Sequence, residues 1–365
     1  MTWAAQWLGW MACALGASWL AVWMLVRASA RLGLIDRPNH RSLHHAPVPR
    51  GGGAAFAAVL AALLGPASLS LDIAVSPAAW RILAAALFVA AIGLADDRFG
   101  LPASLRLAAQ VFAAAVVAAP WFVGAMDAPH AHGRALSLAP LLFAILGIVA
   151  LTNFYNFMDG ADGLAAGQGL LTLAAAGAIA MNGGDQELAL IAALLAAALA
   201  GFLMHNWPPA AIFMGDAGST FLGFLFGSLA ASAAFDSTFT AVPAAAWLCL
   251  LATFLADTTF TLMRRIWRGE PWRRAHREHY YQRLIRSGWS HRRVAAAYLA
   301  VSAILGVLAV GHFALGAGTP AALLVCAFLV LAGAFQLTRR GISGQRPSPA
   351  RGRPLPAPEV GHWQR

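Results

Sequence analysis

The most regular feature of the chain is a succession of long apolar segments separated by short polar breaks. Eleven segments can be marked, at 3–26, 51–71, 78–95, 103–124, 137–156, 164–181, 187–204, 217–233, 241–263, 292–313 and 319–338. Each is long enough to cross about 30 Å of hydrocarbon as an α-helix. The pattern predicts an all-α polytopic membrane protein with about eleven transmembrane helices, or ten if one short Gly/Pro/Asp break is counted differently.

The composition supports a membrane protein. Of the 365 residues, 60% are hydrophobic and only 11% are charged, which excludes soluble, collagen-like and disordered chains. We predict one membrane domain over residues 1–338 and a disordered tail over 339–365, which holds six arginines and five prolines. The three cysteines lie in apolar segments without C-x-x-C spacing, so neither a disulfide framework nor a cysteine metal site is predicted.

The arginines indicate how the helices are oriented. All 25 basic residues are arginine, and if the N-terminus lies outside, 23 of them fall in the segments 27–50, 96–106 and 264–293 and in the tail. Only Arg81 and Arg134 fall on the other side. Because cytoplasmic loops carry an excess of basic residues, we expect an outside N-terminus and a cytoplasmic C-terminus.

Two other interpretations of these features are disfavoured. The net charge of +10 would suggest nucleic acid in a soluble protein, but here it follows from orientation, so no nucleic-acid partner is expected. The first apolar segment has no basic residue before it, and its A-x-A sequence, at residues 28–30, comes only after Arg27. A retained helix is therefore expected instead of a cleaved signal peptide.

The segment from Asn153 to Asp162 carries an amide or carboxylate at every third position. In a straight helix such a stripe drifts by about 60° per step, so the helix must end for these groups to converge. Two Asp-Gly pairs permit a tight turn, which brings Asn156, Asp159 and Asp162 toward one point. The alternative, an ordinary turn, has no need for several polar side chains at the lipid boundary.

Two further polar breaks fall on the same predicted face. Asp96 and Asp97 end the third apolar segment, and because adjacent helical side chains point about 100° apart, at most one should address a shared site while the other orients it or caps the chain. The pair is otherwise a solubilising feature.

Residues 215–219 resemble a helix N-terminus that receives an anion through free N–H groups. Phe213 beside them suits stacking on a nucleobase or a place in the interfacial aromatic belt.

Basic residues and histidines mark two other loops. In 36–53, His44 and Arg50 precede three glycines, which suits a grip on phosphates or a flexible positively charged loop. In 264–293, His276 and His279 lie one helical turn apart, which suits a metal pair, a phosphate site or an amphipathic surface. Zinc would want further ligands nearby, whereas the neighbours are Arg and Tyr, so phosphate contact is favoured.

Carboxylates gather on this one face, at Asp36, Asp96, Asp97, Asp159, Asp162 and Asp216. They repel one another unless a cation is bound, and oxygen ligands favour Mg²⁺ or Mn²⁺ between carboxylates and substrate phosphates. The residues predict phosphoryl transfer at the cytoplasmic surface, between a soluble phosphorylated donor and a molecule in the bilayer. A secondary transporter would place its polar breaks near the midplane, and a scaffold would not explain the one-sided carboxylates.

From about Asp36 to Ser290, the order of motifs resembles the polyprenyl-phosphate N-acetylhexosamine-1-phosphate transferase family, whose other branch is phospho-N-acetylmuramoyl-pentapeptide translocase. The motifs are D-x-P-N-x-R-S-x-H, P-x-P-R-x-G-G, the Asp-Asp pair, N-F-x-N-F-M-D-G-x-D-G-L-A, N-x(6)-F-M-G-D-x-G-S and a final loop with histidines. The resemblance implies Mg²⁺-dependent transfer of a sugar-1-phosphate from a UDP-N-acetylhexosamine to undecaprenyl phosphate, with release of UMP. It also implies a place in the bacterial inner membrane, and a homodimer is compatible with it.

The resemblance also implies roles for single residues. Asp216 corresponds to the Mg²⁺ ligand, and Asp96 and Asp97 to a catalytic pair near the lipid phosphate. His279 corresponds to a catalytic histidine near the diphosphate, with His276 as the alternative. The expected substrate-binding positions, of which the first four correspond to those that hold uridine, are Asn206, Phe213, Asp159, Asp162, Asn156, His44, Arg50 and His276.

Two departures indicate which branch is involved. Residues 276–282 read His-Arg-Glu-His-Tyr-Tyr-Gln, where the peptidoglycan branch has three consecutive histidines, and His45 stands where that branch has a lysine. The Arg-Ser and Pro-Arg-Gly-Gly-Gly sequences are more similar to the branch that starts O-antigen, lipopolysaccharide or other cell-envelope polysaccharides. We expect that branch, with phospho-N-acetylmuramoyl-pentapeptide transfer as the alternative.

Overall fold

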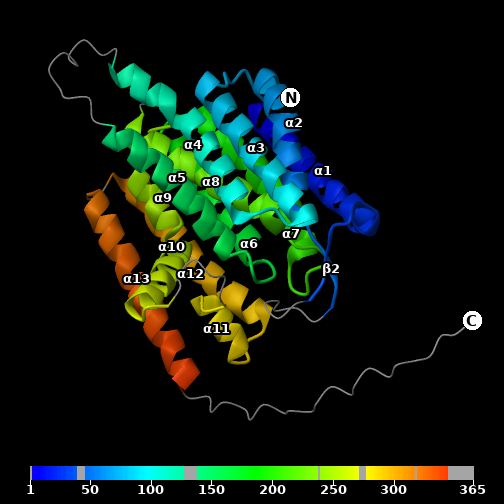
Figure 1. Cartoon of the computed structure of the whole chain (residues 1–365). Helices are drawn as coiled ribbons and strands as arrows, with labels where there is room; N and C mark the ends of the chain where they lie inside the picture. Colours follow the sequence, from blue (N-terminus) through cyan, green and yellow to red (C-terminus); the bar gives the residue numbers. More distant parts are fainter. Residues whose placement is uncertain are drawn as a thin grey trace, which may run out of the picture.

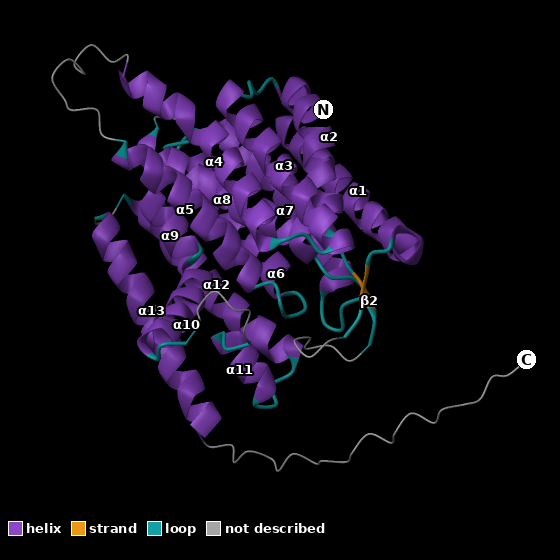
Figure 2. Ribbon diagram, viewed as in Figure 1, coloured by secondary structure: helices purple, strands orange, loops and turns teal. Residues whose placement is uncertain are grey.

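The computed structural model describes residues 2–38, 46–126, 138–236, 239–270, 277–316 and 319–343, and these ranges are mostly helical (Figures 1 and 2). The helices are α1 (Trp3–Leu32), α2 (Gly53–Leu71), α3 (Pro77–Phe99), α4 (Ala103–Met126), α5 (Ala139–Phe157), α6 (Leu164–Asn182), α7 (Gln186–Asn206), α8 (Gly215–Phe235), α9 (Ala244–Leu250), α10 (Ala252–Trp267), α11 (Tyr280–Arg286), α12 (His291–Leu315) and α13 (Pro320–Ser343). Strands β1 (Ile35–Asp36) and β2 (Val48–Pro49) pair antiparallel, with Ile35 opposite Pro49.

The helices confirm an all-α polytopic membrane protein. Within the described ranges, nine helices are long and apolar enough to cross a membrane, or ten if α9 and α10, which are bent by 74° at their break, count as one span. The apolar helix in α13, Pro320–Phe335, is shorter. All eleven predicted segments are therefore helical, but 241–263 is broken into two helices. α13 continues past the predicted domain boundary at 338, and the rest of the predicted tail lies outside the described residues.

α8 lies at the centre of the bundle, and glycines let its neighbours approach closely. In its most apolar part 78% of the residues are buried. Gly53 at the start of α2 lies against the backbone of Gly218, and Gly93 in α3 lies against the backbone of Asp216. A Cβ at Gly53 or Gly93 would overlap backbone atoms of α8, so only glycine permits this packing. The starts of α2 and α8 and the end of α3 are thereby held together.

The break between α9 and α10 coincides with a buried polar cluster. Gln168 of α6 donates from Nε2 to the Leu250 carbonyl oxygen at 2.8 Å, at the point where α9 ends. Its Oε1 accepts hydrogen bonds from the hydroxyls of Thr253 and Ser302. A carbonyl that loses its helical partner in a membrane needs another one, and the glutamine amide supplies it. These bonds stabilise the bend.

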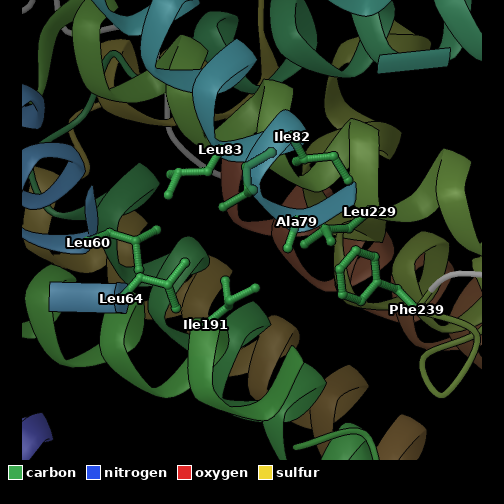
Figure 3. Close-up of a pocket in the computed structure, with 9 residues that line it drawn as sticks. Leu60, Leu64, Ala79, Ile82, Leu83, Ile191, Leu229 and Phe239 are labelled. Atoms are coloured by element: carbon green, nitrogen blue, oxygen red, sulfur yellow. The ribbon is translucent and has the colours of Figure 1, made fainter. Parts of the chain in front are cut away.

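An apolar cavity lies toward the other end of the bundle, away from the end of α3 and the start of α8. It is lined by Leu60, Leu64, Ala79, Ile82, Leu83, Ile191, Leu225, Leu229 and Phe239 (Figure 3). None of these side chains has a polar atom, so the cavity offers nothing to hold a phosphate or a metal ion. The chemistry must be sought at the opposite helix ends.

Candidate active site

Polar helix ends meet at one end of the bundle, which we call the acidic end. Asp96 and Asp97 lie in the last turn of α3, Asp159 follows α5, and Asp216 lies in the first turn of α8. The chain entering α2 reaches the same end, because Phe213 donates from its N–H to the Pro49 carbonyl at 2.8 Å. The structure thus brings together residues that the sequence assigns to one membrane face.

Arg106 links two of these carboxylates. One terminal nitrogen, Nη1, lies 2.8 Å from Asp96 Oδ2 and 2.7 Å from Asp216 Oδ2. Asp96 Oδ1 accepts the Leu101 N–H at 2.6 Å. The Arg106 Nε is buried and has no hydrogen-bond partner among the described residues. The guanidinium therefore lies between the two carboxylates with donor capacity left over.

Asp97 is turned toward different partners, as expected for adjacent helical residues. Its Oδ1 accepts hydrogen bonds from two nitrogens of Arg50, one of them Nε at 3.0 Å, and from the Asp216 N–H at 3.0 Å. Its Oδ2 accepts the Ala217 N–H at 3.2 Å. The side chain is completely buried. The anion received by the start of α8, which the sequence predicted without specifying it, is thus the carboxylate of Asp97, and this carboxylate caps the helix.

Arg50 is held by this contact. Burial acts to lower the pKa of the Arg50 guanidinium. The negative charge of Asp97, the hydrogen bond to Asp97 and the charge of Asp216 outweigh this effect, so the pKa of Arg50 is raised. Asn156 reaches the same cluster, donating from Nδ2 to Asp216 Oδ1 at 3.1 Å and to the Ser219 hydroxyl at 2.8 Å. Asp216 is therefore contacted from α4 and from α5, and its side chain is 21% exposed.

Asp159 lies in the turn between α5 and α6. Removal from water, followed by the negative charges of Asp216 and Asp97, raises the pKa of its carboxyl well above the usual range. This unfavourable gathering of negative charge is relieved when a cation binds, since an opposite charge nearby favours the ionised form.

Asp162 of the same turn faces α12. Its Oδ1 lies 3.1 Å from His291 Nδ1, and its Oδ2 accepts the Ala210 N–H at 3.1 Å. Burial opposes ionisation, but the hydrogen bond and charge of His291 lower the pKa of the Asp162 carboxyl. Asp162 therefore fastens the turn to α12 and to the segment after α7, which is a positioning contact.

Asn206 and Phe213 flank the segment between α7 and α8. Asn206 is 4% exposed, donates from Nδ2 to the Ile212 carbonyl at 2.8 Å, and accepts the Gly163 N–H at 3.0 Å through Oδ1. Both ends of its amide thus join backbone segments. Phe213 is partly exposed, and its carbonyl accepts the Gly52 N–H at 3.0 Å. The predicted contact of Phe213 with uridine stays a prediction.

His279 lies at the start of α11 beside a buried aspartate. Its Nδ1 is 3.5 Å from Asp257 Oδ1, and its ring is stacked with that of Tyr281. It also forms a capping box with Gln282. The side chain is 4% exposed. The structure thus brings His279 to Asp257 of α10, and its catalytic role stays a prediction. His44 and His276 lie outside the described residues.

Two contacts at the acidic end were not expected from the sequence. Arg106 was counted only as an orientation signal, although it is the first basic residue after Arg98 and lies in the first turn of α4. His291, the partner of Asp162, has no motif around it beyond the capping Ser290 at the start of α12. The ten-residue spacing from Asp96 to Arg106 becomes informative only when the α3–α4 turn is known.

The carboxylates at the acidic end fit a metal ion that is held partly by protein and partly by water and substrate. Among the residues that the structure describes, no group of three His, Cys, Asp or Glu side chains is arranged to hold a metal ion. Asp96 and Asp216 are both partly exposed and already share one cation, Arg106. Mg²⁺ is commonly held by one or two carboxylates together with water and substrate phosphates. Asp96 and Asp216 fit that mode, whereas Asp97 has its oxygens engaged.

Comparison with known proteins identifies the family. Residues 79–234, which include Asp96, Asp159 and Asp216, match the model of glycosyl transferase family 4. The decaprenyl-phosphate N-acetylglucosaminephosphotransferase of Mycolicibacterium smegmatis is 34% identical over 316 residues, covering 79% of this chain and 77% of the relative. The chain belongs to glycosyl transferase family 4.

Other relatives in family 4 carry related names. A probable undecaprenyl-phosphate N-acetylglucosaminyl 1-phosphate transferase of Bacillus subtilis is 29% identical over 287 residues, covering 78% of each chain. A phospho-N-acetylmuramoyl-pentapeptide-transferase of Gluconacetobacter diazotrophicus is 29% identical over 308 residues, covering 74% of this chain and 80% of the relative. The predicted family is therefore confirmed, and the chain is a multi-pass membrane protein similar to sugar-phosphate transferases.

Proposed function

We propose that this family 4 protein transfers an N-acetylhexosamine-1-phosphate from a UDP-sugar to undecaprenyl phosphate, giving undecaprenyl-pyrophosphate-sugar and UMP. The observation that carries the proposal is Arg106, which joins Asp96 to Asp216 at 2.8 and 2.7 Å within the segment that matches the family. Two phosphate groups repel each other when they approach. A positive charge held between carboxylates at a helix start offsets this repulsion and therefore suits such a reaction. The relatives named above support the reaction class.

The acceptor needs positioning more than activation. A phosphate monoester has its second pKa near 6, so the lipid phosphate is largely ionised at pH 7 and no residue has to remove a proton. Its oxygen attacks the sugar-linked phosphorus of the UDP-sugar, and the bond between that phosphorus and the bridging oxygen breaks, so that the bridging oxygen leaves with UMP. Arg106 supplies a fixed positive charge, which is the main protein contribution in phosphoryl transfer.

Mg²⁺, for which Asp216 and Asp96 are the proposed ligands, would neutralise negative charge on the phosphates when bound. Asp96 also holds Arg106 in place through its Oδ2. Asn156 fixes the other oxygen of Asp216. These contacts orient the groups before substrate arrives, and such preorganisation stabilises developing charge without a further rearrangement.

The geometry favours direct attack over a covalent aspartyl intermediate. The Asp97 carboxylate is completely buried and accepts hydrogen bonds from Arg50 and from two N–H groups of α8. An oxygen so engaged is a poor nucleophile. We therefore assign Asp97 to holding the start of α8, with Asp216 on it, and we assign no nucleophile to the protein.

The proposed pathway is the start of a cell-envelope polysaccharide of the O-antigen type, at the cytoplasmic face of the bacterial inner membrane. The sequence departures at 276–282 and at His45 support this branch over transfer of phospho-N-acetylmuramoyl-pentapeptide. UDP-N-acetylglucosamine and UDP-N-acetylgalactosamine are then the first donors to test, and the muramoyl-pentapeptide donor should give no product.

The deciding experiment follows radiolabel from the sugar nucleotide into a lipid-extractable product with purified protein, undecaprenyl phosphate and Mg²⁺. The Asp216→Asn variant should fold normally and lose transfer at all practical Mg²⁺ concentrations, because an amide is a poor metal ligand. Exchange of labelled UMP into the UDP-sugar without lipid would contradict direct attack. A failure of every UDP-N-acetylhexosamine to give lipid product would contradict the proposed function.

A further inference from the structure

Tyr281 of α11 joins that helix to the turn between α5 and α6. Its side chain is 1% exposed. The phenol donates to the Phe157 carbonyl oxygen at 3.1 Å and accepts from Gln282 Nε2 at 3.1 Å. It also packs against Gly160, where an added Cβ would overlap the phenol oxygen. One side chain therefore contacts the residues on both sides of Met158 and Asp159.

The position of this phenol is set from within the bundle. Asp257 of α10 accepts the Tyr280 N–H at 2.7 Å through Oδ1 and the Tyr281 N–H at 3.0 Å through Oδ2. The Tyr298 hydroxyl of α12 donates to Asp257 Oδ2 at 2.7 Å. The start of α11 is thus fastened to two other helices, so the phenol is a fixed point against which the turn rests.

The second half of the turn has other supports. Asp162 is held by His291 and the Ala210 N–H, and the Gly163 N–H donates to Asn206. These contacts lie after Gly160 in the chain. Tyr281 supports the first half, which carries Asp159.

We propose that Tyr281 is a positioning residue for the sugar-nucleotide donor. Its phenol fixes the backbone on both sides of Asp159, so that this carboxylate meets the donor in one arrangement. The inference rests on the proposed function and on the predicted contact of Asp159 with the uridine of the donor. Tyr281 acts through the turn and has no part in the bond-making step. Its loss should therefore weaken the binding of the donor and leave the binding of the lipid acceptor unchanged.

The kinetic test is Tyr281→Phe, which removes only the hydroxyl. The KM for the UDP-sugar should rise about three- to tenfold, the change that loss of one hydrogen bond produces, while the KM for undecaprenyl phosphate stays constant. The matched control is Tyr280→Phe, the same change one residue earlier, where the ring contacts Phe335 instead. It should leave both KM values unchanged. Equal changes in both KM values, or a loss of active protein alone, would overturn the proposal.

A second readout does not depend on turnover. Amide hydrogen exchange over residues 157–163 should become at least threefold faster in Tyr281→Phe than in the wild type, and remain unchanged in Tyr280→Phe. If no UDP-sugar is turned over, the proposed function fails while this measurement still tests the contact. Unchanged exchange in Tyr281→Phe would show that the phenol does not hold the turn.

A double-mutant cycle tests the contact with Gly160 directly. Gly160→Ala should raise the KM for the UDP-sugar in the wild type, because the new methyl group meets the phenol oxygen. In the Tyr281→Phe background, Gly160→Ala should raise the KM for the UDP-sugar less, because the phenol oxygen that the new methyl group meets is absent. Effects that simply add would mean that Gly160 and Tyr281 do not interact in the working enzyme.

Discussion

At the scale of single residues, the acidic end balances carboxylates with arginines in two separate groups. The Asp97 carboxylate is completely buried beside Arg50 and also caps α8, whereas Asp96 and Asp216 with Arg106 remain partly exposed. The first arrangement holds structure, because breaking a buried ion pair leaves an uncompensated charge. The second can exchange a partner for a substrate phosphate. Two adjacent aspartates thereby acquire different roles.

The first prediction concerns Arg106. Arg106→Gln should lower kcat by about 10²- to 10³-fold, because it removes the positive charge that lies beside the reacting phosphates. Arg106→Lys should recover part of the activity, since lysine supplies a point charge without the planar fork. The control is Arg98→Gln, an exposed arginine that lies over the Phe99 ring, which should retain full activity. A fully active Arg106→Gln enzyme would show that its contact with Asp216 is only structural.

The second prediction concerns Phe213. Phe213→Ala should weaken UMP and UDP-sugar binding by about 1–3 kcal/mol, the contribution of a base stacked on an aromatic ring. Binding of undecaprenyl phosphate should stay the same. Phe88→Ala, an exposed aromatic of α3, serves as the control and should leave nucleotide binding unaltered. Unchanged UMP affinity in Phe213→Ala would leave Phe213 as an interfacial residue.

At the scale of elements, two features could not be predicted from apolar periodicity. Residues 241–263 form one largely apolar segment, and the 74° bend between α9 and α10 lies where Gln168, which is distant in sequence, bonds the Leu250 carbonyl. α11 falls in an Arg-rich loop, and its start depends on Asp257. Both features are set by buried polar contacts between helices, which a sequence pattern does not reveal.

Gln168 provides the prediction at this scale. Gln168→Leu removes the amide that donates to the Leu250 carbonyl and accepts from the Thr253 hydroxyl, and should lower the free energy of unfolding in detergent by about 1–2 kcal/mol. A lower melting temperature is the simplest measurement. Gln186→Leu, at the exposed start of α7, should change it little. Equal stability of the two variants would mean that the bend is set without Gln168.

At the scale of the whole molecule, the gathering of polar residues at one end followed from the sequence once the apolar segments were counted. Alternate helices reverse direction, so breaks after α3 and α5 and before α8 had to fall on the same side. The ion pairs at that end could not be predicted from the sequence. Arg50 with Asp97, and Asp162 with His291, join segments that are far apart in the chain. The packing of α8 against α2 and α3, and of α12 against α6, brings these segments together.

The orientation of that end in the membrane is the last prediction. Because 23 of 25 arginines fall on the side of the acidic end, the positive-inside rule assigns this end to the cytoplasm, where UDP-sugars are made. In an active variant without the three native cysteines, Arg286→Cys on α11 should react with a membrane-impermeant maleimide only after the inner face is opened. Asn182→Cys, exposed at the far end of α6, should react in intact cells whose outer barrier is permeable. The reverse labelling pattern would put the carboxylates outside and leave the proposed transferase without access to its donor.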